Sequence, residues 1–180
     1  MSSGPACPKC GLSTWVEIGG GTLFDMTEGI PVYHPNIDAQ EGARIDIVCD
    51  LEVNDIPLHD EHADRIKAMH FLQHLPYARA KHFLKDCFRV LKPSGSLFLM
   101  VGDMEWVFKE ILKENQENLD LPYGLGFCVW GEQEHKYDFH KWGYTFNSLK
   151  KLLEICVGFT NIQHRGHYNP WEFMVEAFKP

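Results

Sequence analysis

An amphipathic helix followed directly by an apolar strand is the feature that most constrains how this chain folds. After Pro76, apolar side chains recur every three or four positions up to Leu91, which predicts a helix with one buried stripe. The run Lys92-Pro93-Ser94-Gly95 ends this helix, and residues 96–101 then form a strongly apolar segment typical of a buried strand. Because helices that alternate with buried strands are typical of α/β proteins, we expect a mostly parallel sheet.

Short apolar runs supply the other expected strands. They lie at residues 14–18, 45–49, 66–70, 159–164 and 173–178. Asp103 and Asn147 are placed to cap two further helices, and Gly158 to end the second of them. The turn before the last strand contains glycine, asparagine and proline, which favours a C-terminal antiparallel hairpin. We expect one α/β domain over residues 14–180, with a long functional loop at residues 115–146.

The most informative turn is Gly19-Gly20-Gly21, which follows the first strand. Glycines there let backbone amides approach a ligand without interference from side chains. Asp38 follows Gly21 by 17 residues, about where an α/β site places an acid that binds ribose hydroxyls. Phe24 stands where a GxGxxG fingerprint needs its last glycine, so a nicotinamide cofactor is poorly supported. A plain tight turn and an ordinary turn aspartate are the simpler interpretations.

Composition argues against two classes of partner. The 17 Lys and Arg against 25 Asp and Glu give a net charge of −8, which repels phosphate polymers, so we expect no nucleic-acid partner. No apolar run reaches the ~20 residues that span a bilayer, and residues 1–10 lack the features of a secretion signal. We therefore expect a cytoplasmic protein without membrane insertion.

Among the six cysteines, Cys7 and Cys10 form a CxxC pair. This is the spacing of half a zinc knuckle, but a tetrahedral site needs two more ligands, and we find no second CxxC or HxxxH pair. We therefore expect no metal, with a zinc knuckle as the alternative. Residues 1–13 are interpreted as a frayed N-terminal tail.

Several segments, in this order, resemble class I S-adenosylmethionine (SAM)-dependent methyltransferases of the small methyltransferase-like type. The resemblance covers residues 15–180 and is carried by VEIGGG at residues 16–21, NID at 36–38, DIVCDL at 46–51 and MHFLQHL at 69–75. The most specific segment is RVLKPSG at residues 89–95, which is similar to the family's RVLKPGG turn with Ser94 in place of a glycine. The resemblance implies a Rossmann-like fold and S-adenosyl-L-methionine as cofactor.

The resemblance also implies a cofactor site. The glycine turn, formed by Gly19, Gly20 and Gly21, would face the methionine part of SAM, and Glu17 would orient the turn and the cofactor amine. Asp38 would bind the ribose hydroxyls, and Asp50 and Leu51 would lie beside adenine. His70 and Phe71 would line the place where the methyl group meets its acceptor.

The acceptor is a small molecule, a glycan or a protein group, and an NPPY-type motif that would hold an exocyclic amine is missing after the fourth strand. Histidine titrates near neutral pH, which makes His70, His135 and His140 candidate proton acceptors. We favour His140, because aromatic side chains and a lysine surround it in the sequence DFHKWGY at residues 138–144. The alternative is a loop whose aromatic residues only cover the core.

The sequence departs from the family pattern between its first strands. Residues 22–35 contain a glycine and two prolines, and residues 39–44 are too few for an ordinary parallel crossover, so the first two crossover helices are shortened or absent. A non-catalytic SAM-binding or scaffold protein is therefore the alternative function. Since parallel strands are usually apolar on both faces, we also expect the uncovered end of the sheet to be buried in a homodimer or under an irregular lid.

Overall fold

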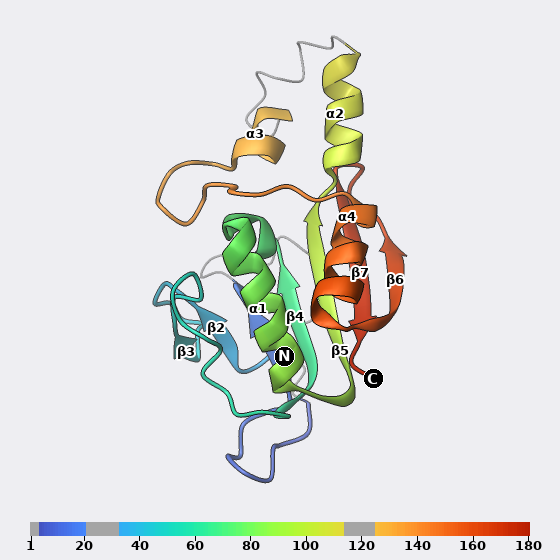
Figure 1. Cartoon of the computed structure of the whole chain (residues 1–180). Helices are drawn as coiled ribbons and strands as arrows, with labels where there is room; N and C mark the ends of the chain where they lie inside the picture. The colour runs from blue at the N-terminus through green and yellow to red at the C-terminus, as the bar shows by residue number, and fades with distance from the viewer. Residues whose placement is uncertain (1–3, 21–32, 114–124) are drawn as a thin grey trace.

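The computed structural model describes residues 4–20, 33–113 and 125–180 (Figure 1). Their strands form one seven-stranded sheet in the order β3-β2-β1-β4-β5-β7-β6. The strands are β1 Trp15–Ile18, β2 Asn36–Asp38, β3 Ile47–Val48, β4 Ala63–Met69, β5 Leu91–Gly102, β6 Thr160–Gly166 and β7 Glu172–Phe178. The pairs from β3 to β5 are parallel, while β7 lies antiparallel between β5 and β6. The α/β fold expected from the sequence, including its antiparallel end, is confirmed.

Strand β2 is the element that sequence reasoning did not recognise as a strand. It has only three residues, and the Ile37 side chain is fully buried between β1 and β3. The backbone N–H of Gly19 donates to the carbonyl of Ile37, at 2.8 Å from nitrogen to oxygen. Partners on both sides, rather than a hydrophobic pattern, therefore stabilise this short strand.

Helices connect the second half of the sheet. They are α1 Tyr77–Val90, α2 Met104–Leu112, α3 Leu125–Trp130 and α4 Phe146–Lys151, with a 3₁₀ turn at Leu72–His74 and a π-helical turn at Leu152–Val157. Asp103 caps α2 as predicted, because its Oδ1 accepts hydrogen bonds from two backbone N–H groups of the first turn. The stop at Gly158 also holds, since this residue has a left-handed φ of 104°.

The start of α4 differs from the prediction. Thr145, not Asn147, is the N-cap: its hydroxyl oxygen accepts from the Ser148 N–H, while the Ser148 hydroxyl oxygen accepts from the Thr145 N–H. This reciprocal capping box satisfies two backbone donors at once, which a lone Asn147 two residues later cannot do.

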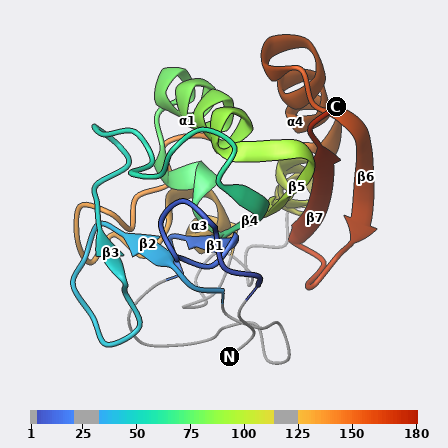
Figure 2. The same ribbon diagram turned by 90° about the horizontal axis from the view of Figure 1, so that it is seen from below.

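One face of the sheet is apolar and carries helices. Figures 1 and 2 show α1 and α4 side by side on this face. The stripe predicted for α1 points inward, with Phe83, Leu84 and Cys87 almost completely buried. The strand residues beneath the helices are buried: Val16, Ile18, Ile66, Ala68, Leu97, Leu99, Val101, Phe173, Val175 and Ala177. The main hydrophobic core therefore lies between this face and the two helices.

The opposite face of β1 and β4 is charged, contrary to the expectation that these strands are apolar on both sides. Glu17 and Lys67 occupy neighbouring positions there, with Nζ 2.9 Å from Oε2 and each side chain 4% exposed. One register position away, the Arg65 guanidinium stacks over the Trp15 ring, and the Lys67 ammonium lies over the Tyr33 ring. Within the described residues, an ion pair and cation–π contacts occupy this face. The homodimer stays a prediction. It assumed that the uncovered strands are apolar on both faces, and β1 and β4 are not.

The crossovers from β2 to β3 and from β3 to β4 contain no helix within the described residues. For the crossover from β2 to β3, this was expected from its short length. Most of the crossover from β1 to β2, residues 21–32, lies outside the described residues. The crossover from β3 to β4 instead buries Leu51, Ile56 and Leu58 against the core. Arg89 of α1 holds this loop by donating to the carbonyls of Ile56 and Leu58.

The N-terminal segment is ordered against the domain and is not the frayed tail expected from the sequence. Residues 4–13 form a small hairpin in which the Cys7 N–H donates to the Leu12 carbonyl, and the Cys7 side chain is only 3% exposed. A second pair of potential metal ligands, not expected from the sequence, is present: His59 and His62 lie beside Cys7 and Cys10. The boundary between the tail and the domain at residue 13 stays a prediction. Among the described helices, none has both the length and the apolar character needed to cross a membrane.

Candidate active site

A cavity of about 430 Å³ opens where β1, β2 and β4 end at their carboxyl edges. This is the edge at which open α/β sheets bind ligands, and the volume is typical of a small-molecule site. The cavity brings together all but one of the predicted site residues: Glu17, Gly19, Gly20, Asp38, Asp50, Leu51, His70, Phe71 and His140. The exception, Gly21, lies outside the described residues.

The glycine turn has no room for side chains. Gly19 has a φ of 64°, and a Cβ atom there would lie 2.5 Å from the Phe71 ring. A Cβ atom on Gly20 would lie 2.7 Å from the Asn36 side-chain amide, whose oxygen accepts from the Gly20 N–H. The turn therefore needs glycine both for its backbone conformation and for the close approach of β2 and β4 residues.

Glu17 is held beneath this turn. Its Oε2 accepts a hydrogen bond from the Tyr33 N–H at 3.1 Å and lies 2.9 Å from the Lys67 ammonium. The negative charge is therefore matched within the protein, on the floor of the cavity. This geometry suits a residue that fixes the backbone around the glycine turn.

Two aspartates stand at the ends of the next strands, and local turns fix both of them. Asp38 accepts from the Gln40 N–H at 3.0 Å, and Asp50 accepts from the Glu52 N–H at 2.9 Å. In each case a carboxylate oxygen closes a turn with the residue two positions later. Both side chains are therefore oriented before any ligand arrives.

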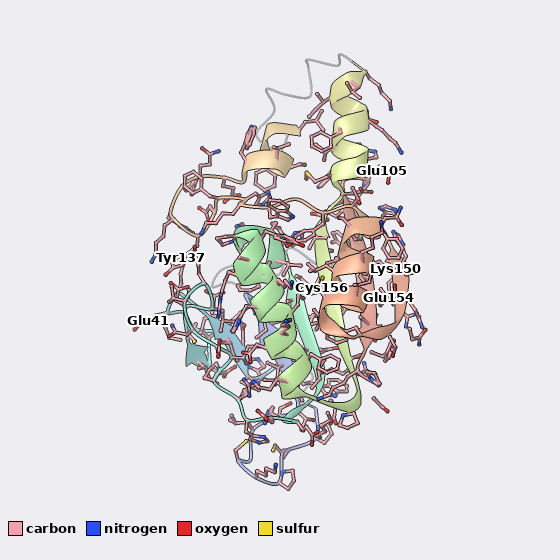
Figure 3. All side chains as sticks on the ribbon, in the orientation of Figure 1. Glu41, Glu105, Tyr137, Lys150, Glu154 and Cys156 are labelled. Carbon is pink, nitrogen blue, oxygen red and sulfur yellow. The ribbon has the colours of Figure 1, made fainter. Side chains whose placement is uncertain are left out.

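The segment after α3 covers this part of the cavity. The Tyr137 hydroxyl donates to Asp50 at 3.2 Å, the Lys141 ammonium lies 2.7 Å from a Glu52 oxygen, and the Gln40 amide donates to His135 at 3.2 Å. Figure 3 shows Tyr137 on this loop, toward the end of the sheet where β2 and β3 lie. This loop thus borders the cavity beside the crossovers from β2 to β3 and from β3 to β4. His135, one of the three candidate bases, makes a contact of this covering loop.

Three histidines gather in the other part of the cavity. His70 follows β4, His74 lies on the 3₁₀ turn, and His140 comes from the loop after α3. The rings of His74 and His140 meet edge to face with their centroids 4.9 Å apart. His70 has a φ of 54°, an uncommon conformation for a side-chain-bearing residue, and its Nε2 lies 3.6 Å from a Glu172 oxygen. Sequence reasoning did not single out His74, although its i, i+4 spacing from His70 was a usable signal.

Burial keeps the histidine cluster neutral. Desolvation lowers the pKa of His70 to about 4. Desolvation, assisted by His140, also lowers the pKa of His74 to about 4. For His140, desolvation lowers the pKa against an opposing hydrogen bond to the Cys128 carbonyl. The Nδ1–H groups of His74 and His140 donate to the Phe139 and Cys128 carbonyls, so each neutral ring keeps its Nε2 lone pair as an acceptor.

Two further polar groups of the cavity were missed by sequence reasoning. Burial raises the pKa of the Glu172 carboxyl, which faces His70. Within the described part of the chain, the buried Oε1 of Gln73 accepts no hydrogen bond. Buried acceptors are usually satisfied, so this oxygen is suited to a hydrogen-bond donor of a ligand. Both residues lie far in sequence from the glycine turn, and only the fold brings them to it.

The low pKa values predict that stability falls in mild acid. A histidine with a pKa of about 4 in the folded state binds its proton more readily when unfolded, where the value is near 6.5. The stabilising contribution is therefore complete above about pH 6.5 and is lost as the pH falls toward 4, by up to about 3 kcal/mol for each histidine. Urea unfolding at pH 7 and pH 5 measures this slope, and we expect His74→Gln to make it shallower. An unchanged slope in His74→Gln contradicts the prediction.

The chain is similar in sequence and in structure to known methyltransferases. The family described as a methyltransferase domain matches residues 33–99. A SAM-dependent methyltransferase from Archaeoglobus fulgidus is similar in structure, with a TM-score of 0.60 and 16% identity over 92% of this chain and 85% of that one. One from Thermotoga maritima, described as a possible histamine N-methyltransferase, has a TM-score of 0.58 and 16% identity over 92% of this chain and 82% of that one.

A third similar structure is human N-acetylserotonin methyltransferase, crystallised in complex with SAM. Its TM-score is 0.55 with 15% identity over 92% of this chain and 47% of that one. No curated protein matches the sequence significantly. Residues 33–99 are therefore similar in sequence to a methyltransferase domain, and the chain shares the fold of these SAM-dependent methyltransferases.

The charged groups that line the cavity suit SAM as a ligand. SAM carries a sulfonium and an ammonium, both cationic, and carboxylates of Asp38, Asp50 and Glu172 line the cavity. The glycine turn leaves backbone groups uncovered by side chains on one wall. Fixed negative groups in an enclosed site favour a cationic ligand.

Proposed function

We propose that this protein transfers a methyl group from SAM to a small-molecule acceptor within the cavity. The observation that carries the proposal is a single cavity that joins the glycine turn and two fixed aspartates to a cluster of neutral histidines. When bound, SAM supplies a methyl group on a positively charged sulfur. The cavity volume of about 430 Å³ favours a small molecule over a glycan or a protein group.

The glycine-turn part of the cavity binds the cofactor in this proposal. Gly19 and Gly20 let the methionine portion approach the backbone, with Glu17 supporting the turn from below. Asp38 binds the ribose hydroxyls, and Asp50 with Leu51 borders the adenine. Phe71 packs against Gly19 and lines the same cavity.

The histidine part of the cavity binds the acceptor. Methyl transfer needs alignment of two reactants, exclusion of water and, for a protonated acceptor, removal of one proton. His140 removes that proton through its Nε2 lone pair, since its Nδ1–H is committed to the Cys128 carbonyl. His70 lines the acceptor region beside Glu172. The covering loop limits the entry of water.

Asp38→Ala tests the cofactor part of the proposal. We expect this substitution to weaken SAM binding by roughly 1 to 3 kcal/mol, because the ribose hydroxyls lose their acceptor. Isothermal titration calorimetry with SAM and with its demethylated product, S-adenosylhomocysteine, measures the effect. Asp55→Ala is the matched control, because Asp55 is exposed and pairs with Arg79 and His82 outside the cavity. Unchanged SAM affinity in Asp38→Ala removes Asp38 from the site.

A non-catalytic SAM-binding protein is the second candidate function. The crossover from β2 to β3, which has no helix, favours it, because catalytic alignment there depends on loops. The two functions differ in turnover. Formation of S-adenosylhomocysteine above background, measured by mass spectrometry with a panel of small amines, imidazoles, phenols and thiols, supports the enzyme. SAM binding without product for any of them supports the second candidate.

A further inference from the structure

Four side chains with metal-binding atoms converge at the edge of the sheet opposite the cavity. They are Cys7 and Cys10 of the N-terminal hairpin and His59 and His62 of the loop that leads into β4. All four ligand atoms lie within 4.8 Å of one another. Figure 1 shows the N-terminal hairpin at the lower edge and the loop after α3 at the upper edge. This cluster is therefore separate from the candidate active site.

Three distances between ligand atoms of the cluster are close to those of a tetrahedral zinc site. Cys7 Sγ lies 3.2 Å from His59 Nε2, Cys10 Sγ lies 3.6 Å from His62 Nδ1, and the two histidine nitrogens are 3.4 Å apart. Zinc bonds of about 2.3 Å to sulfur and 2.0–2.1 Å to nitrogen, at tetrahedral angles, separate the ligand atoms by about 3.3–3.8 Å. These three separations are close to those that one tetrahedral zinc ion imposes, and the other ligand atoms are within 4.8 Å of one another.

Hydrogen bonds outside the cluster fix both imidazole rings for this purpose. The Nδ1–H of His59 donates to the Asp60 carbonyl at 2.8 Å, and the Nε2–H of His62 donates to the Ser13 carbonyl at 2.9 Å. In each ring the other nitrogen, with its lone pair, is the one that faces the cysteines. Such bonds to backbone carbonyls are the usual means by which proteins orient zinc-binding histidines.

A tight turn also shapes the backbone around the two cysteines. Gly11, directly after Cys10, has a φ of 78°, and its N–H donates to the Cys7 carbonyl at 2.8 Å. This tight turn brings two cysteines separated by two residues to one side of the hairpin.

We propose that Cys7, Cys10, His59 and His62 bind one structural zinc ion. Four protein ligands complete the tetrahedral shell and leave no position for a substrate, so the role is structural rather than catalytic. Two thiolates balance the charge of Zn²⁺, and their protons go to solvent when the metal binds. The ion would join the segment before β1 to the segment before β4. Strands β1 and β4 are parallel neighbours in the sheet. The ion would therefore anchor the crossover from β3 to β4, which contains no helix.

Metal analysis of the full-length protein tests the site. The chain is produced in zinc-supplemented medium and purified without chelators, and its metal is measured by plasma mass spectrometry. We expect about one zinc per chain. We expect Cys10→Ser and His59→Gln to reduce this to below about a tenth, while Cys156→Ser, on the turn after α4 (Figure 3), keeps the wild-type value. Wild-type protein with less than about a tenth of an equivalent overturns the proposal and leaves four hydrogen-bonded side chains.

Cobalt substitution gives a second measurement that does not depend on how the variants fold. Wild-type protein stripped with a chelator and reloaded with Co²⁺ should show the intense visible bands of tetrahedral cobalt and a thiolate-to-metal charge-transfer band. The weak spectrum of six-coordinate cobalt, or the absence of a thiolate band, contradicts the assignment. We also expect the chelator to lower the melting temperature of the zinc-loaded protein, and an unchanged value argues against a structural role.

Discussion

His140→Ala is expected to reduce the rate of methyl transfer by about 10²-fold or more while leaving the affinity for SAM nearly unchanged. The reason is the position of the ring, which presents a neutral Nε2 to the histidine part of the cavity and lies apart from the glycine turn. Removing it takes away a proton acceptor but no group assigned to the cofactor. The rate is measured as S-adenosylhomocysteine formed with an acceptor from the small-molecule panel, and the affinity by calorimetry.

His82→Ala is the matched control for this substitution, because His82 pairs with exposed Asp55 on the outer surface of α1. It should keep both the rate and the affinity. The pH profile separates proton removal from packing. Since desolvation lowers the pKa of His140 below its ordinary value, wild-type activity should persist to a lower pH than free imidazole catalysis allows. Full activity in His140→Ala would assign this residue to packing.

Lys67→Ala is expected to cost about 3–5 kcal/mol of folding stability. Lys67 and Glu17 are 2.9 Å apart and each is 4% exposed, so the substitution removes the buried cation that faces this carboxylate. A buried charge that loses its counter-ion is far more costly than an exposed one. Urea unfolding at pH 7 measures the loss.

The double variant Glu17→Gln with Lys67→Met identifies the cause. It removes both charges and keeps similar side-chain volumes, so we expect it to regain most of the stability lost in Lys67→Ala. Lys92→Ala is a surface comparison: Lys92 pairs with Asp64, both side chains are about a third exposed, and its loss should cost at most about 1 kcal/mol. Equal losses in Lys67→Ala and the double variant would show that packing, not the unpaired charge, determines the effect.

The apolar patterns predicted the larger elements because burial alone decides them. The stripe of α1 and the runs that became β1, β4, β5 and β7 point to one core, and local propensity agrees with that burial. Strand β2 has three residues and depends on hydrogen bonds to β1 and β3, so no pattern in its own sequence could identify it. Helix α4 began two residues earlier than expected, because a reciprocal side-chain cap competed with a single one.

The same division holds for the candidate site. Glycines after a strand and aspartates at strand ends follow local rules, and these residues line the cavity. Gln73 and Glu172 could not be assigned to the cavity from local rules, because their role depends on which distant segments fold beside them. The zinc cluster was missed for a similar reason: the second pair, His59 and His62, has a shorter spacing than the HxxxH pair that was sought.

The sequence by itself determined the class of fold, the resemblance to a methyltransferase domain and the glycine turn, since each depends on a short pattern of burial or backbone freedom along the chain. Only the tertiary structure decided how the sheet is completed beside crossovers that contain no helix within the described residues. The Glu17–Lys67 pair lies on one face of β1 and β4, and a covering loop contacts Asp50 and Glu52 after β3. These contacts join residues far apart in sequence, and their energy depends on desolvation that exists only after the chain has folded.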